Sequence, residues 1–157
     1  MPKSKKEENM TVDESASLEQ QFSQLPFALA ADNWLKSIPG KSVAKQLRER
    51  KISTIRFVPL ISSGGLGIQK GGANFFVLLN DINSPQENAQ TLGHEIGHTF
   101  LYNLNGAPSQ PFSLRYKKDA EELIEEFCYQ FSSAWLAKND AGNVILRCRN
   151  QAQLIQI

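Results

Sequence analysis

The chain has 157 residues, of which 41% are hydrophobic, enough to bury one ordinary core and too few for two full domains. Its 17 basic and 16 acidic residues give a formal net charge of +1, so no net field favours nucleic acid or an anionic membrane. We find neither a signal peptide pattern nor a run of about eighteen apolar residues. Cys128 and Cys148 lack a CxxC partner and are expected to be reduced thiols. These features predict one cytoplasmic domain that contacts neither membrane nor nucleic acid.

The N-terminal third is expected to contain a tail and two helices. Residues 1–17 are rich in Lys, Glu and Asp and offer almost nothing to bury, which predicts a disordered tail before a single domain of residues 18–157. Apolar residues recur at helical intervals from Leu18 to Ile38, where Pro26 should begin or break a helix. A second, short helix is expected from Ser42 to Arg50.

Two segments rich in β-branched and aromatic residues follow, Thr54–Ile61 and Asn74–Leu79. The glycine-rich stretch Ser62–Gly72 lies between them, so the pattern predicts an antiparallel hairpin with a long loop. The stretch does not fit a phosphate-binding loop, because Lys70 precedes glycine instead of Ser or Thr.

The best specified element is a helix expected over Pro85–Leu104. Ser84 can cap it, Pro85 suits the first helical position, and Glu87 completes a capping box. Asn105 and Gly106 are expected to close it.

A further helix is expected from Asp119, as its N-cap with Glu122 at the third position, to about Lys138. Residues Val144–Arg149 could form a final strand.

The helix expected over Pro85–Leu104 carries His94-Glu95-Ile96-Gly97-His98, an H-E-x-x-H motif. Histidines four residues apart lie one helical turn apart, so both imidazoles can reach one metal ion. A catalytic zinc site needs a third protein ligand and leaves its fourth position for water. Glu95 lies beside the histidines and could take a proton from the water that the metal activates, then pass it to the leaving amine. This assigns Glu95 as general base.

The histidines project away from the apolar stripe of their helix, which argues against two satisfied core histidines. Two surface histidines at this spacing by coincidence remain the alternative, but chance produces the full motif in only about one such chain in a thousand. We therefore predict a metal site, with Zn2+ the default and another divalent ion such as Mn2+ open. The stripe consists of Ala89, Leu92, Ile96 and Phe100.

Four acids on the following helix compete for the third ligand position. Glu121 and Glu122 fall in its first turn, where the helix dipole and the cap already explain them. Glu125 lies opposite the large apolar residues, on a face that is not simply solvated, and Glu126 lies on a flank. Periodicity alone favours Glu125 without deciding among the neighbours.

Across about residues 42–136 the chain resembles the ImmA/IrrE metallopeptidases. One match is Phe75–Asn80, which resembles the strand of that family and its asparagine. The other is Ser84 with Gln90–His98, which resembles the family's T-L-x-H-E-x-G-H helix. The downstream pattern E-x-x-[AC]-x-x-F-[AS]-x-x-x-L matches Glu125, Cys128, Phe131, Ser132 and Leu136. The family often has a proline just after its paired leucines, where this chain continues Trp135-Leu136-Ala137-Lys138, a departure that affects the cleft wall and not the ligands.

The resemblance implies that Glu125 is the third metal ligand and that the protein is a zinc-dependent endopeptidase. It also implies a small α+β metallopeptidase domain, in which a short antiparallel sheet packs on the HExxH helix and the next helix supplies the Glu ligand. The substrate that it implies is a protein, a helix-turn-helix transcriptional repressor of a stress or phage-defence operon.

Two further residues are candidates for oxyanion or substrate contacts, Tyr102 and Phe76, although aromatic residues near a helix end more often pack. The strand at Asn74–Asn80 could be an edge to which an extended substrate adds, or an ordinary core strand. The alternative function is a catalytically inactive metal-containing domain that binds or senses a protein partner. An intact Glu95 argues against it, because a pure binding site needs no base there.

Overall fold

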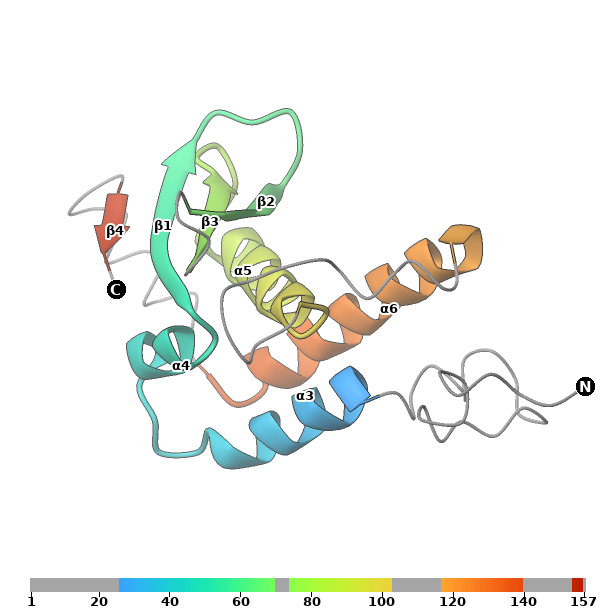
Figure 1. The fold of residues 1–157 in the computed structure, drawn as a ribbon. Helices are drawn as coiled ribbons and strands as arrows, with labels where there is room; N and C mark the ends of the chain where they lie inside the picture. Colours follow the sequence, from blue (N-terminus) through green and yellow to red (C-terminus); the bar gives the residue numbers. More distant parts are fainter. Residues whose placement is uncertain (1–25, 70–73, 103–116, 140–153, 157) are drawn as a thin grey trace, which may run out of the picture.

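The structure is a computed structural model that describes residues 26–69, 74–102, 117–139 and 154–156 (Figure 1). Its helices and strands confirm the expected α+β class. The expected tail of residues 1–17 and strand of residues 144–149 lie outside the described residues. Within the described part, no helix is both long and apolar enough to cross a membrane. The elements are α3 (Pro26–Ser37), α4 (Val43–Glu49), β1 (Ile52–Val58), β2 (Gly64–Ile68), β3 (Phe75–Asn80), α5 (Pro85–Thr99), α6 (Lys117–Leu136) and β4 (Leu154–Gln156).

Two helices begin where the sequence predicts. A third, α3, is described from Pro26, the residue expected to begin or break a helix, and the expected helical residues 18–25 lie outside the described part. The Ser42 side chain accepts a hydrogen bond from the Lys45 backbone N–H at 3.1 Å and caps α4. Ser84 and Glu87 form the predicted capping box of α5, with reciprocal bonds of 3.1 and 3.2 Å. These bonds satisfy backbone donors that a helix start leaves without a partner, so the N-terminal end of α5 is firmly placed.

The C-terminal end of α5 differs from the prediction. The helix ends at Thr99 instead of continuing to Leu104, and the residues expected to close it, 105 and 106, lie outside the described part. After Thr99 the backbone tightens: the N–H groups of Phe100 and Leu101 donate to carbonyls three residues back, at 3.2 and 3.1 Å. Phe100 and Leu101, in this tightened turn, are both buried in the core.

The start of α6 is also different. The helix begins at Lys117, so Asp119 lies inside its first turn instead of at the N-cap. Asp119 and Glu122 therefore do not form the predicted cap arrangement.

The sheet is mixed, with strand order β2-β3-β1-β4. β1 runs parallel to β3, whereas β2 pairs with β3 and β4 with β1 in antiparallel fashion. The predicted hairpin of residues 54–61 and 74–79, and with it the short antiparallel sheet, is therefore wrong. The hairpin partner of β3 is β2, from the glycine-rich segment that was expected to be a loop. Glycine permits this pairing because the ring of Phe76 lies against Gly67, where a Cβ would collide with it.

The core lies between the sheet and the helices. Figure 1 shows α5 between the sheet and α6, with α3 along the far side of α6. On β3, Phe75, Val77 and Leu79 are buried whereas Phe76 and Leu78 are only half-buried, so alternate side chains face the helices. The largest fully buried apolar side chains are Ile38, Ile52, Phe57, Phe75, Val77, Leu79, Leu92, Ile96 and Trp135.

Asn80, the last residue of β3, ties the sheet to α5 and to the segment that leads into β2. Its side-chain amide donates to the carbonyls of Leu60 and Ser62 at 2.9 and 3.0 Å. Its backbone carbonyl accepts a bond from the fully buried Asn88 amide of α5 at 3.0 Å. These bonds fix the start of β2 beside the exposed face of α5.

Candidate metal centre

His94 and His98 lie one turn apart on α5, and their Nε2 atoms are 3.2 Å apart. Their side chains are 12% and 22% exposed and line a cleft of about 470 Å³. The apolar stripe predicted for the opposite side of this helix is buried as expected: Ala89, Leu92, Ile96 and Phe100. The histidines therefore face a cleft and not the main core.

Glu125 of α6 meets both histidines. Its Oε2 lies 2.8 Å from His94 Nε2, and its Oε1 lies 3.2 Å from His98 Nε2. Its side chain is 51% exposed, so it approaches from the solvent side of the cleft. Of the four acids that the sequence leaves in competition, only this one makes ion-pair contact with the histidines in the described part.

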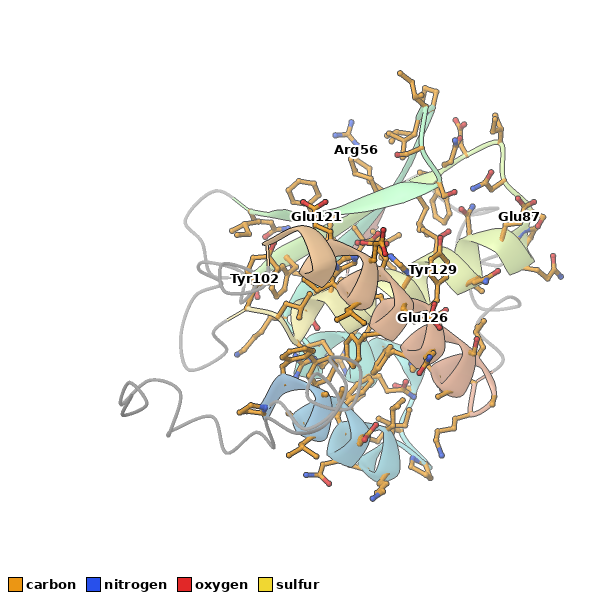
Figure 2. The ribbon with its side chains drawn as sticks, turned by 90° about the vertical axis from the view of Figure 1, so that its right-hand side faces the viewer. Arg56, Glu87, Tyr102, Glu121, Glu126 and Tyr129 are labelled. Carbon is orange, nitrogen blue, oxygen red and sulfur yellow. The ribbon has the colours of Figure 1, made fainter. Side chains whose placement is uncertain are left out.

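The three other candidate acids lie elsewhere on α6. Glu121, Glu122 and Glu126 are exposed, and Glu126 accepts a hydrogen bond from Gln130 at 2.9 Å. Figure 2 labels Glu121 and Glu126 at different places along the helix. None of the three acids lines the cleft.

The distances among the three side chains suit a tetrahedral metal ion. Bonds of about 2.0 to 2.1 Å in a tetrahedron place ligand atoms about 3.3 Å apart. The observed nitrogen–nitrogen and nitrogen–oxygen distances of 3.2, 2.8 and 3.2 Å come close to this edge. His94 Nδ1 is buried without a hydrogen-bond partner among the described residues, which leaves the outward-facing Nε2 as the ligand atom.

Cys128 of α6 lies near the same two histidines. Its Sγ and one ring nitrogen of each histidine all lie within 4.8 Å of one another, so these three side chains could hold a metal ion. The residue is 0% exposed. Burial, followed by the charges of Glu125 and Glu95, raises the pKa of its thiol. Without a metal the sulfur is therefore protonated.

Glu95 directly follows His94 in the sequence. It lies in the wall of the cleft and is buried, with 7% of its surface exposed. Burial, and secondly the charge of Glu125, raises its pKa from 4.5 to about 7. Burial also lowers the pKa of His98, an effect that the charge of Glu125 opposes. A carboxyl group with a pKa near neutrality can both accept and return a proton under ordinary conditions.

Two glycines allow α6 to approach α5 closely enough for Glu125 to reach the histidines. A Cβ on Gly93 would lie 2.7 Å from the Ser132 hydroxyl, and one on Gly97 would lie 3.3 Å from the Cα of Cys128. Ser132 also donates to the Gln90 carbonyl of α5 at 2.6 Å. The glycine within the H-E-x-x-H motif therefore serves the helix crossing.

Arg50 holds the end of α5 next to His98. Its Nε donates to Thr99 Oγ1 at 3.1 Å, and its guanidinium carbon lies 3.4 Å from the centroid of the Phe100 ring. Burial lowers the pKa of Arg50 to about 9, still well above neutrality. A cation at a helix C-terminus interacts favourably with the helix dipole, so this contact stabilises the turn that carries His98.

The two aromatic residues predicted as oxyanion or substrate contacts do not line the cleft. Tyr102 packs edge-to-face on Phe75, with ring centroids 5.2 Å apart. Phe76 lines a separate groove on the sheet. In Figure 2 Tyr102 lies well apart from Tyr129, which does line the cleft.

Sequence reasoning assigned no role to two residues that lie at the site, Cys128 and Tyr129. The ring of Tyr129 is 4.6 Å from that of His94, and its side chain is largely exposed. The usable signal is their spacing of three and four residues from Glu125, which places all three side chains on one side of α6.

Comparison with known proteins adds no relative: no family model, no curated protein and no solved structure matches this chain.

Proposed function

We propose that the protein is a zinc-dependent endopeptidase in which His94, His98 and Glu125 hold the ion and Glu95 transfers protons. The observation that carries the proposal is the contact of one carboxylate with both Nε2 atoms, at 2.8 and 3.2 Å, beside a buried carboxyl group. Two imidazoles and one carboxylate are a ligand set typical of zinc peptidases.

The chemistry divides between the ion and Glu95. A bound zinc ion would polarise the substrate carbonyl and make a water molecule a stronger nucleophile. Glu95 accepts the proton that this water loses and donates it to the amine that leaves. In the metal-free protein burial raises the pKa of Glu95 to about 7, so this carboxyl group holds a proton more readily than an exposed glutamate does, as a group that accepts and returns a proton must.

The edge of the sheet offers a place for an extended substrate. β3 lies between β2 and β1, so the edge role considered for it from sequence is excluded. β2 pairs only with β3 among the described strands, and Ser62, Ser63 and Gly64 at its start line the histidine cleft. A peptide that pairs with β2 would pass beside the ligands, and strand addition requires no fixed side-chain sequence. A helix-turn-helix repressor, the substrate class implied by the ImmA/IrrE resemblance, would need such a segment exposed.

The second candidate function is a metal-containing binding or sensor domain. Cys128 favours it, because a thiol near the histidines could complete a closed site of the kind found in structural zinc centres. Glu95 favours the enzyme, because a closed site has no use for a proton acceptor.

Cleavage of a proteome-derived peptide library, with products identified by mass spectrometry, tests the proposal. We expect the zinc-loaded wild type to cleave peptides, and Glu95→Gln to bind zinc equally but cleave about 10² to 10⁴ times more slowly. His94→Ala should lose both zinc and activity. Glu126→Gln, an exposed acid on α6, is the matched control and should behave as wild type. Equal cleavage by wild type and Glu95→Gln would contradict the proton-transfer role.

A further inference from the structure

Cys128 is fully buried beside the histidine pair, whereas the Glu125 side chain that contacts the same histidines is half exposed. It follows Glu125 by three residues, less than one turn of α6. Its Sγ lies 3.4 Å from the position that a Cβ on Gly97 would occupy, and Gly97 directly precedes His98. The sulfur and the carboxylate therefore both lie next to the same two imidazoles.

The distances bring this sulfur within reach of a shared ion. Zinc bonds of about 2.3 Å to sulfur and about 2.0 Å to nitrogen place the two ligand atoms about 3.5 Å apart in a tetrahedron. The Cys128 sulfur and the histidine nitrogens already lie within 4.8 Å of one another. The sulfur lies 3.4 Å from where a Cβ on Gly97 would be, so glycine at this position leaves the Cys128 side chain room to adjust.

We propose that Cys128 is an internal fourth ligand, which with His94, His98 and Glu125 closes the coordination shell of a thiophilic ion. The proposal rests on the metal centre of the proposed function and adds a means of regulating it. When the ion binds, the thiol releases its proton to solvent and a sulfur–metal bond forms. A thiolate in the shell would compete with the reacting water for the remaining position, so it would slow cleavage without abolishing it.

The identity of the ion then decides the state of the site. Thiolates favour zinc over manganese, whereas carboxylates and water suit manganese. Zinc would favour the state with Cys128 in the shell, so the zinc centre would cleave peptides more slowly than it would without the thiolate. Manganese would leave the thiol out and keep the fourth position open.

Cobalt-substituted full-length protein provides the test, since a cobalt–thiolate bond gives a charge-transfer absorption in the near ultraviolet that nitrogen and oxygen ligands do not. We expect this band in the wild type, its loss in Cys128→Ser and its retention in Cys148→Ser, which controls for the only other cysteine of the chain. Zinc-loaded Cys128→Ser should also cleave peptides faster than the zinc-loaded wild type.

Absence of the band from cobalt-loaded wild type, or a band unchanged in Cys128→Ser, would overturn the proposal. X-ray absorption on the zinc-loaded wild type counts sulfur neighbours without any substitution, so the proposal stays falsifiable if Cys128→Ser does not fold. If the wild type binds cobalt without a sulfur ligand, only the role of Cys128 is overturned, and the metal centre of the proposed function stands. Failure to bind cobalt or zinc at all removes the metal centre and the proposed peptidase with it.

Discussion

The two helices that form the candidate metal centre contribute to it in different ways. α5 supplies His94, Glu95 and His98 within five consecutive residues, so the helical repeat alone sets their spacing. α6 supplies Glu125 and Cys128, which reach the histidines only through the packing of one helix on the other. One half of the site is local in sequence, and the other is a product of the tertiary structure.

This difference separates the ways in which each half can fail. A substitution on α5 removes a ligand directly, while the helix keeps its capping box and its buried stripe. The α6 ligand depends on a helix crossing that Gly93 and Gly97 of α5 make possible, so substituting either glycine, neither of which is a ligand, can displace Glu125. Measurements that vary the two halves independently should therefore give different patterns of metal affinity and stability.

The largest expected effect concerns the choice among the acids of α6. Glu125→Ala should weaken zinc binding by about 10³-fold, or about 4 kcal/mol, because it removes a ligand and a compensating negative charge. Glu121→Ala, Glu122→Ala and Glu126→Ala should bind zinc as the wild type does, since these side chains are exposed and away from the cleft. Competitive titration with a chelator of known affinity measures all four variants.

A second readout distinguishes a ligand from a residue that only stabilises the fold. Zinc should raise the thermal unfolding temperature of wild type, Glu121→Ala, Glu122→Ala and Glu126→Ala, and much less that of Glu125→Ala. Tight zinc binding by Glu125→Ala would mean that the α6 half of the site is assigned to the wrong residue.

A smaller effect is expected from pH, which should change the free energy of unfolding of the metal-free protein by up to about 3 kcal/mol. The pKa of Glu95 rises from 4.5 to about 7 on folding, and each pKa unit corresponds to about 1.4 kcal/mol. Below pH 4.5 the carboxyl group is protonated in both states and has no effect. Between pH 4.5 and 7 only the unfolded chain releases the proton, so the metal-free protein loses stability, and above pH 7 the loss is complete.

Denaturant unfolding in the presence of a chelator, at pH 4.5 and pH 8, measures this loss. Glu95→Gln should lack it, and the difference between the two proteins cancels the contributions of His98 and other groups. Glu125→Gln should reduce the loss in part, because the charge of Glu125 is the second cause of the shift after burial. Identical pH dependence in wild type and Glu95→Gln would show that Glu95 ionises normally in the fold.

The sequence predicts the local half of this molecule far better than the rest. The capping box of Ser84 and Glu87 and the orientation of the α5 stripe depend on neighbours within four residues, and the structure confirms both. The choice of Glu125 among its neighbours needed the resemblance, because helical periodicity alone cannot say which turn of α6 crosses α5.

The sheet was predicted least well, for a physical reason. Glycine has low strand propensity, so Gly64–Ile68 read as a loop, yet the aromatic ring of Phe76 covers Gly67 across the strand pair. The parallel pairing of β1 and β3 depends on where β2 inserts, which no local pattern encodes. If residues 64–68 are taken as a loop, the two remaining strands are neighbours in the sequence, and the usual short connection between such strands is an antiparallel hairpin.

The smallest expected effect tests the helix crossing itself, through Gly93 and Gly97. Replacing glycine by alanine inside a helix gains about 1 kcal/mol from propensity. At Gly93 the new methyl group would lie 2.7 Å from Ser132 Oγ and 3.0 Å from a Trp135 ring carbon, and overpacking of this kind costs about 1 to 3 kcal/mol. At Gly97 the closest atoms would be 3.3 Å away, so a small adjustment relieves the contact.

We therefore expect Gly93→Ala to destabilise the metal-free protein by up to about 2 kcal/mol and Gly97→Ala to change its stability by less than about 1 kcal/mol. Gly65→Ala, where a Cβ meets nothing within 4 Å, is the control for a harmless methyl group. The Ser132 backbone lies 3.1 Å from the added Cβ at Gly93, so relief requires α6 to move and should also weaken zinc binding through Glu125. Urea unfolding and zinc titration on the three variants test both parts. If Gly97→Ala proves more damaging than Gly93→Ala, the closest point of the crossing lies one turn further along α5, at the level of Cys128.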